Sequence, residues 1–192
     1  MVRKLKYHEQ KLLRKVDFIG NDTADHRAHS VNRRYVIQNP NDYSAYNRIC
    51  GNLKQLAHRL AALDPADPVR AKFETLMLDK LWDMGLLGRA GGEEGGEGGK
   101  AKLSEVERKL GVSAFARRRL GVVMTRIGMV QTVQTAIKFI EQGHVRVGPE
   151  VVTDPAFLVT RNMEDFVTWV DSSKIKRNIL KYRDNLDDFE LL

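Results

Sequence analysis

The stretch RRRLGVVMTRIGMVQTVQTAIKFIEQGHVRVGPEVV, residues 117–152, decides the fold of this chain. Up to Gln142 its apolar residues recur every three or four positions, and from His144 onward they alternate with polar residues. The first spacing is typical of amphipathic helices, and the second is typical of a half-buried strand. Glycines stand at 128 and 143, where they can end helices. The stretch therefore predicts two helices followed by a β-hairpin.

The first helix of this pair is expected between Val112 and Ile127, with one apolar face. On that helix Arg117 and Arg118 would lie on the solvent side, and Arg119 would project beside Arg126 two turns away. Guanidinium groups in this arrangement suit phosphates and stacked bases, because their planar fork makes paired hydrogen bonds. A solvated charge face that merely stabilises the helix is the alternative for any one of them.

The second helix is expected between Val130 and Gly143, with Gln131 and Lys138 on its outer face. Helix–turn–helix geometry serves DNA as well as RNA, so this pair alone does not choose between them.

Extended segments follow the two helices. His144 and Arg146 would lie on one face of the first strand, and His144 could serve as an RNA contact or a structural hydrogen-bonding group. The pattern predicts a compact α+β unit, two helices packed on a short twisted sheet. The expected extended segments are His144–Val147, Val151–Val152, Pro155–Val159 and Phe166–Val170.

The rest of the chain divides by composition. Residues 1–40 are a basic arm with a loop expected over Gly20–Ser30, and residues 41–87 carry two apolar stripes that predict an antiparallel helical hairpin. Residues 88–100 are rich in glycine and lack an apolar anchor, which indicates a disordered insertion. We place the RNA-binding domain at 101–171. Residues 172–192 form an extension whose acidic tail could be solvated or could dock on a protein.

The positive charge is segregated. The chain has a net charge of +7, while residues 1–34 alone carry nine Lys/Arg against four Asp/Glu and residues 100–146 carry ten against three. A basic surface favours a polyanionic partner, because each contact with a phosphate releases condensed counterions. The arm residues expected to contribute are Arg3, Lys4, Lys6, Lys11, Arg14 and Lys15.

Other classes of protein fit poorly. A single cysteine, Cys50, allows no intrachain disulfide, and no stretch approaches the roughly 18 apolar residues of a membrane span. The histidines lack metal-ligand spacing, and the helical region offers no convergent catalytic residues. We therefore expect neither an enzyme nor a metal or cofactor site.

Several motifs in the α+β unit resemble the RNA-binding domain named after small-subunit ribosomal protein S-four. They include Arg126-Ile127-Gly128-Met129, Gln142-Gly143-His144-Val145 and Val151-Val152. The resemblance implies recognition of structured RNA by shape and backbone. Many members of that family carry Asn-Gly in the hairpin where this chain has Val147-Gly148-Pro149, which leaves the type of turn open.

The resemblance extends over nearly the whole chain except the glycine-rich insertion. The segments MVRKLKYHEQKLLRKVDF (1–18), DYSAYNRI (42–49), LDKLWDMGLL (78–87) and the stretch 139–177 resemble S-four-like subunits of the U3 small nucleolar ribonucleoprotein. The resemblance implies a nucleolar component of the small-subunit processome. It would promote pairing of U3 small nucleolar RNA with pre-ribosomal RNA for processing to 18S rRNA. It also implies a large scaffold phosphoprotein and a Brix-domain protein as partners.

A permanent small-subunit ribosomal protein with the same domain is the alternative function. An enzyme that uses the domain for RNA targeting is a weaker alternative.

The candidate RNA-binding residues come from the α+β unit and the extension after it. They are Arg117, Arg118, Arg119, Arg126, Gln131, Lys138, His144, Arg146, Arg161, Lys174, Lys176 and Arg177.

Overall fold

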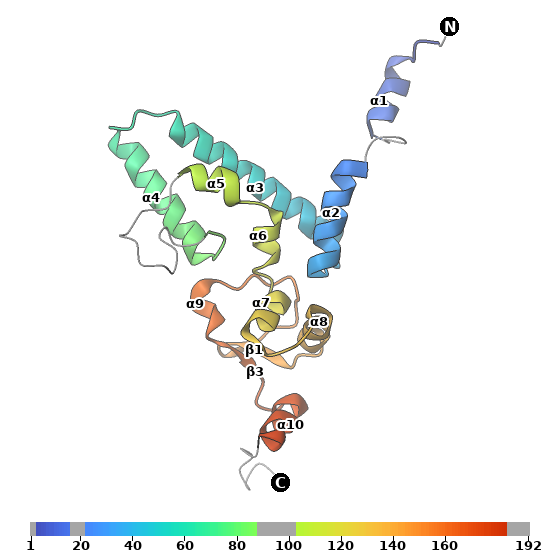
Figure 1. Ribbon diagram of the computed structural model, residues 1–192, viewed down its shortest axis with the longest axis vertical. Coiled ribbons are helices and arrows are strands. Elements are labelled where there is room, and N and C mark those ends of the chain that lie inside the picture. The colour runs from blue at the N-terminus through green and yellow to red at the C-terminus, as the bar shows by residue number, and fades with distance from the viewer. Residues whose placement is uncertain (1–2, 16–21, 88–102, 184–192) are drawn as a thin grey trace.

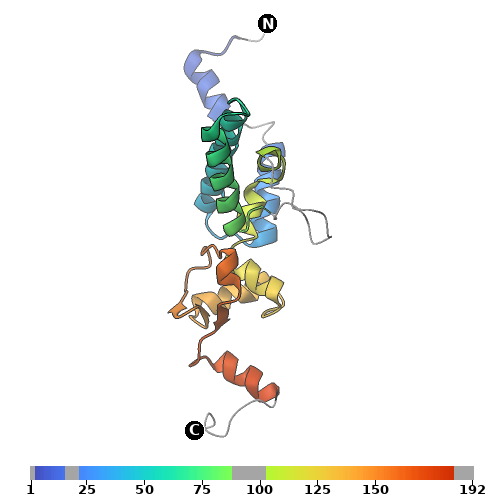
Figure 2. The same cartoon turned by 90° about the vertical axis from the view of Figure 1, so that its left-hand side faces the viewer.

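The computed structural model describes residues 3–15, 22–87 and 103–183, without the side chains of residues 13–15 and 22–26. Two bodies lie one above the other: a bundle of helices and a small unit of helices and strands (Figures 1 and 2). Helices α1 and α10 extend from opposite ends of the molecule (Figure 1). The elements are α1 (Tyr7–Lys15), α2 (Asp22–Tyr35), α3 (Pro40–Ala61), α4 (Pro68–Asp83), α5 (Leu103–Lys109), α6 (Val112–Ala116), α7 (Leu120–Ile127), α8 (Val133–Glu141), β1 (Val145–Val147), β2 (Glu150–Val151), α9 (Arg161–Glu164), β3 (Val167–Trp169) and α10 (Lys174–Tyr182).

Helices α3 and α4 form the expected antiparallel hairpin (Figure 1). Each begins with a proline that follows a capping residue. The Asn39 side chain accepts a hydrogen bond from the Asn41 N–H at 3.0 Å, and the Asp67 carboxylate accepts one from the Val69 N–H at 2.8 Å. A proline suits the first helical position, where its missing N–H costs no helical bond.

The first body, here called the helical unit, consists of α3 to α6, residues 40–116. Its core is aliphatic with one stacked aromatic pair, Tyr46 and Phe115, whose ring centroids lie 5.5 Å apart. Leu81, Val106 and Leu110 are at most 2% exposed. Burying each such side chain stabilises the fold by about 1.5–3 kcal/mol, so this body has a core of its own.

The second body, here called the sheet unit, spans residues 118–171. Within the described residues it holds a three-stranded antiparallel sheet of order β2-β1-β3, and α7 and α8 pack against each other beside it. Val145, Val167 and Leu120 are buried between sheet and helices. The predicted α+β fold, with two helices on a small sheet after a helical region, is confirmed.

The turn that the sequence left open is a tight two-residue one. Val147 pairs with Glu150, so only Gly148 and Pro149 connect β1 to β2. Gly148 has φ +62°, the left-handed value that a II′ turn requires at its first central residue. Pro149 then occupies a position whose negative φ suits its ring.

The helix expected from Val112 to Ile127 is instead two helices, α6 and α7, separated at residues 117–119. The Leu120 N–H donates to the Phe157 carbonyl at 2.9 Å, and the Val159 N–H donates to the Arg118 carbonyl at 2.8 Å. Backbone pairing with a distant segment therefore replaces helical bonds at this point. Of the extended segment expected over Pro155–Val159, the structure retains only a single bridge between Leu158 and Arg119.

The loop expected over Gly20–Ser30 is also wrong, because Asp22 begins helix α2. The sequence there is polar, and local preference favoured a loop. Val31 and Tyr35 nevertheless pack on Ala116 and Val122, which lie in α6 and α7. This tertiary contact stabilises a helix that the local sequence does not specify. The segments expected as a glycine-rich insertion and an acidic tail, residues 88–100 and 184–192, lie outside the described residues.

Gly85 lies where the two bodies meet, against the guanidinium of Arg118. It follows α4 with φ +69°, and a Cβ built there would lie 2.7 Å from the Arg118 guanidinium carbon. Both the backbone conformation and the close approach exclude a side chain at this position.

We predict that Gly85→Ala lowers the free energy of unfolding by about 1–3 kcal/mol, since alanine at positive φ is strained and displaces Arg118. Gly51→Ala is the matched control: Gly51 lies inside α3 with nothing within 4 Å of a built Cβ. There alanine should stabilise by about 0.5–1 kcal/mol. Chemical denaturation of both variants measures this, and equal effects would contradict the assignment.

Candidate RNA-binding surface

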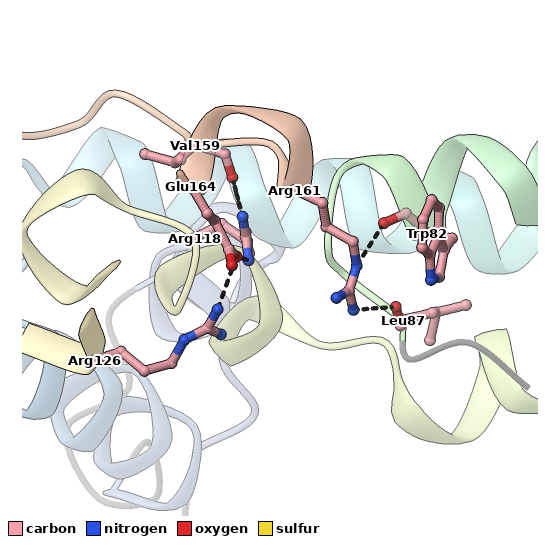
Figure 3. A network of polar contacts seen from close by, with 7 residues as sticks. All are labelled: Trp82, Leu87, Arg118, Arg126, Val159, Arg161 and Glu164. Atoms are coloured by element: carbon pink, nitrogen blue, oxygen red, sulfur yellow. Dashed lines mark hydrogen bonds and ion pairs between the residues drawn. The ribbon is translucent and has the colours of Figure 1, made fainter. Parts of the chain in front are cut away.

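Arg118 lies inside the molecule, not on the solvent side as predicted. Only 3% of the residue is exposed. Its Nε and Nη2 atoms donate to the Val159 carbonyl at 2.8 and 2.5 Å, and Nη1 donates to the Glu164 carboxylate (Figure 3). The break before α7 turns this side chain toward α9. The Arg118 side chain therefore binds Val159 and Glu164 inside the molecule, and it is not exposed to contact RNA.

Arg119 is also 3% exposed and points the other way, into the helical unit. Its Nη1 donates to Asp42 Oδ2 at 2.8 Å and to the Tyr46 hydroxyl at 3.1 Å. Burial raises the pKa of the Tyr46 hydroxyl, and the Arg119 charge opposes that shift without cancelling it. The predicted pairing of Arg119 with Arg126 on one exposed face is wrong, because Arg119 precedes α7 in extended conformation.

Arg161 makes a third contact between the two bodies. Its Nε donates to the Trp82 carbonyl at 3.0 Å and its Nη2 to the Leu87 carbonyl at 3.3 Å (Figure 3). Its guanidinium carbon lies 5.3 Å from the centroid of the Trp82 ring. Both carbonyls belong to the end of α4 and the residues after it, where few helical partners remain. Arg161 satisfies these groups and is not a free phosphate ligand.

Arg126 is exposed but not unpaired. Its Nη2 lies 2.7 Å from Glu164 Oε1, and 57% of its side chain is exposed. Burial alone would raise the pKa of Glu164. Hydrogen bonds and positive charge from Arg118, with a further contribution from Arg126, outweigh that effect and hold the pKa below its ordinary value. One carboxylate thus pairs with a buried and an exposed guanidinium at once, which leaves a net positive charge on the group.

Five predicted RNA-binding residues are exposed and make no ion pair with any residue that the structure describes. They are available for phosphates and bases. Arg117 ends α6, Gln131 and Lys138 lie before and on α8, and Lys174 and Arg177 lie on α10.

The remaining three candidates come together where α10 leaves the sheet. Asp171 bridges Arg146 on β1 and Lys176 on α10, with both contacts at 2.5 Å. The hydrogen bond from Lys176 does most to lower the pKa of Asp171, and the Arg146 charge adds to it. His144 Nδ1 lies 3.0 Å from the Ser173 hydroxyl, which is the structural role left open for this histidine. These contacts fix the first turn of α10 against β1.

Part of the N-terminal arm forms helix α1, over Tyr7–Lys15. Arg3 pairs with Glu9 at 2.7 Å, while Lys4, Lys6 and Lys11 are exposed. The side chains of Arg14 and Lys15 lie outside the described residues, so their predicted role stays a prediction.

Sequence reasoning missed two cations near these candidates, Lys181 and Arg183. Both belong to the last turn of α10 or follow it directly. The run KIKRNILKYR, residues 174–183, places Ile175, Ile179 and Leu180 at helical spacing with basic residues between them. That signal of a basic amphipathic helix was present but lay beyond the expected domain boundary.

Comparison with known proteins accounts for both bodies. A model of the ribosomal protein S4/S9 N-terminal domain matches residues 4–115, and a model of the S4 domain matches residues 118–165. A Saccharomyces cerevisiae U3 small nucleolar ribonucleoprotein protein IMP3 is 56% identical over 191 residues, covering 99% of each chain. The chain belongs to the IMP3 family. The Homo sapiens IMP3 is 49% identical over 193 residues, covering 100% of this chain and 99% of its own length.

This chain is also similar, more distantly, to a ribosomal protein. A Metallosphaera sedula small ribosomal subunit protein uS4 is 30% identical over 146 residues, which cover 75% of this chain and 73% of the relative. The boundary between the two matching models falls between residues 115 and 118, directly at the arginine run. Arg118 and Arg119 therefore stand at the junction of the two family domains.

The described part of this IMP3-family chain contains no group of three or more His, Cys, Asp or Glu side chains that could hold a metal ion. A search of the same residues for helices long and apolar enough to cross a membrane finds none.

We predict that Arg118→Met lowers the free energy of unfolding by about 3 kcal/mol, because it leaves the buried Val159 carbonyl without its donor and Glu164 with Arg126 alone. The neighbouring Arg117→Met should change it by less than about 0.5 kcal/mol. Conversely, Arg117→Met should weaken RNA affinity and reduce its salt dependence by about one phosphate contact. Denaturation and RNA titration at several salt concentrations separate these roles. A stable Arg118→Met variant would contradict the structural assignment.

A second prediction concerns pH. Because the folded state lowers the pKa of Glu164, its carboxylate stabilises the fold fully above the ordinary pKa of about 4.3 and loses that effect as pH falls further. Glu164→Gln should therefore be destabilised at neutral pH, with the difference from the unmodified chain narrowing below about pH 4. Glu150→Gln alters an exposed hairpin carboxylate and serves as the control. A difference independent of pH would refute the ionic role.

Proposed function

We propose that this chain is a non-catalytic RNA-binding subunit of the U3 small nucleolar ribonucleoprotein, acting in the small-subunit processome of the nucleolus. There it would promote pairing of U3 small nucleolar RNA with pre-ribosomal RNA, for early processing to 18S rRNA. The observation that carries the proposal is the extent of the similarity. Relatives named for that particle match this chain over 99–100% of its length, so both bodies are shared and not the S4 domain alone.

The charge distribution supports contact with RNA. Among the exposed candidates, Arg117 lies directly after α6, Lys138 lies on α8, and Lys174 and Arg177 lie on α10. In addition, the N-terminal arm presents Lys4, Lys6 and Lys11 (residues 3–15). Cations on separate elements can follow a folded RNA backbone, which is how structured RNA is recognised by shape.

The proposed protein partners are a large scaffold phosphoprotein and a Brix-domain protein. Their support is the resemblance of the whole chain to processome subunits. A subunit that bridges RNA and proteins needs no reaction of its own, in keeping with the non-catalytic role.

A structural protein of the small ribosomal subunit is the second candidate. The observation in its favour is the 30% identity to the uS4 protein over 146 residues. That relationship leaves about a quarter of each chain unmatched, and it is weaker than the full-length similarity to the IMP3 proteins.

Recovery of the RNA bound to the tagged full-length chain tests the two candidates. We expect U3 small nucleolar RNA and pre-ribosomal RNA to be enriched far above mature 18S rRNA. In a gradient, the chain should sediment with large precursor particles and be absent from translating ribosomes.

Depletion gives an independent measurement. Loss of the chain should reduce 18S rRNA while leaving the large-subunit RNA unchanged. Stable association with translating ribosomes would instead favour the structural ribosomal protein, and an unchanged ratio of the two rRNAs would overturn the processing role.

A further inference from the structure

Helix α10 lies on the side of the S4 domain away from the helical unit (Figure 2). A cleft is lined by residues of α10, the sheet and the end of α7. Its volume is about 500 Å³, within the roughly 300–1,000 Å³ of pockets that hold small ligands. Two kinds of side chain line it. The apolar wall is made by Ile127, Met129, Ile179 and Leu180, and the cationic rim by Arg146, Lys176 and Arg183.

The apolar wall faces solvent. Ile127 is the last residue of α7, before Gly128, and is 47% exposed. Ile179 and Leu180 are half-buried, and α10 has no fully buried residue. Trp169 also borders the cleft, where its ring packs edge-on against Phe139 at 5.8 Å between centroids. The apolar wall is therefore held by packing on one side and is exposed to solvent on the other.

The cationic rim keeps a positive excess. Among the described residues that line the cleft, none is acidic, and the Asp171 carboxylate beside it pairs with both Arg146 and Lys176. Arg183 makes no ion pair with any residue described in the structure. Counted over the residues that the structure describes, three cations and one carboxylate leave a net charge of +2 beside the exposed apolar wall.

We propose that this cleft binds one unpaired nucleotide of an RNA strand, with its base on the apolar wall and its phosphate at Arg183 and Lys176. This inference rests on the RNA-binding function proposed above and deepens it. A planar, weakly polar base joined to an anion matches a wall and rim of this composition. A double helix cannot offer that combination, since its bases are stacked inside. The cleft therefore selects single-stranded RNA, whereas the exposed cations Arg117 and Lys138 contact the backbone of folded RNA.

The anchoring of α10 supports the same conclusion. Ser173 is 4% exposed and bonded to His144, while Asp171 holds Lys176 against Arg146. The first turn of α10 is thus fixed to β1, and the cleft exists before a ligand arrives. A preformed site avoids the entropic cost of ordering a helix on binding.

The test measures affinity of the full-length chain for a short oligouridylate and for the same strand with abasic sugars, at physiological ionic strength. The intact strand should bind about fivefold to tenfold more tightly, since a stacked base contributes measurably to affinity. Ile127→Ala should remove most of that preference and leave binding of the abasic strand unchanged. Ile49→Ala is the matched control, an isoleucine that is 42% exposed on α3, and should change neither.

A charge-matched pair on one helix tests the phosphate site. Arg183→Gln should weaken binding of both strands at least threefold more than Lys181→Gln, because Lys181 does not line the cleft. Equal effects of the two variants, or equal affinity for intact and abasic strands, would overturn the cleft as a nucleotide site while leaving RNA binding in place. A chain that binds neither the strands nor U3 small nucleolar RNA would refute both proposals.

Discussion

Two adjacent guanidinium groups, on Arg118 and Arg119, are buried where the two bodies meet, and each needs acceptors there. A buried charge without partners costs several kcal/mol, so the chain around these residues must supply them. Arg118 takes the Val159 carbonyl and Glu164 on one side, and Arg119 takes Asp42 on the other. Both side chains lie at the break between α6 and α7, where Gly85 leaves room for the Arg118 guanidinium and α9 supplies Glu164.

Much of the fold follows from local signals. Apolar periodicity and the Asp67-Pro68 and Gly143 signals place the hairpin, α7, α8 and β1 near their observed positions, because those residues act on their own turn or strand. The helix break and α2 do not follow, since both depend on partners far away in sequence. From residue type alone, Arg118, Arg119 and Arg161 were as good candidates for RNA contact as Arg117. Only tertiary structure separates a guanidinium that binds carbonyls from one that faces solvent.

The basic residues fall into two groups, those that bind acceptors inside the molecule and those that face solvent. Arginine satisfies acceptors at the junction because its fork reaches a carbonyl and a carboxylate together, as Arg118 does. The exposed Lys138 and Lys174 make no ion pair within the described residues and belong to the proposed RNA-binding surface. Part of the positive charge is thus used inside the molecule, so the proposed surface is smaller than the composition suggests. Its cations lie directly after α6, on α8, on α10 and in the N-terminal arm.

The arginine contacts also set an order of events when the chain is made. Asp42 is bonded to a residue 77 positions later, and the Trp82 carbonyl to one 79 positions later. A ribosome therefore releases α3 and α4 long before their partners exist. The helical unit can form its core early, but it cannot be locked in place until Arg161 has emerged. The contacts between the two bodies are consequently completed only after the sheet unit has been synthesised, whereas the core of the helical unit does not depend on them.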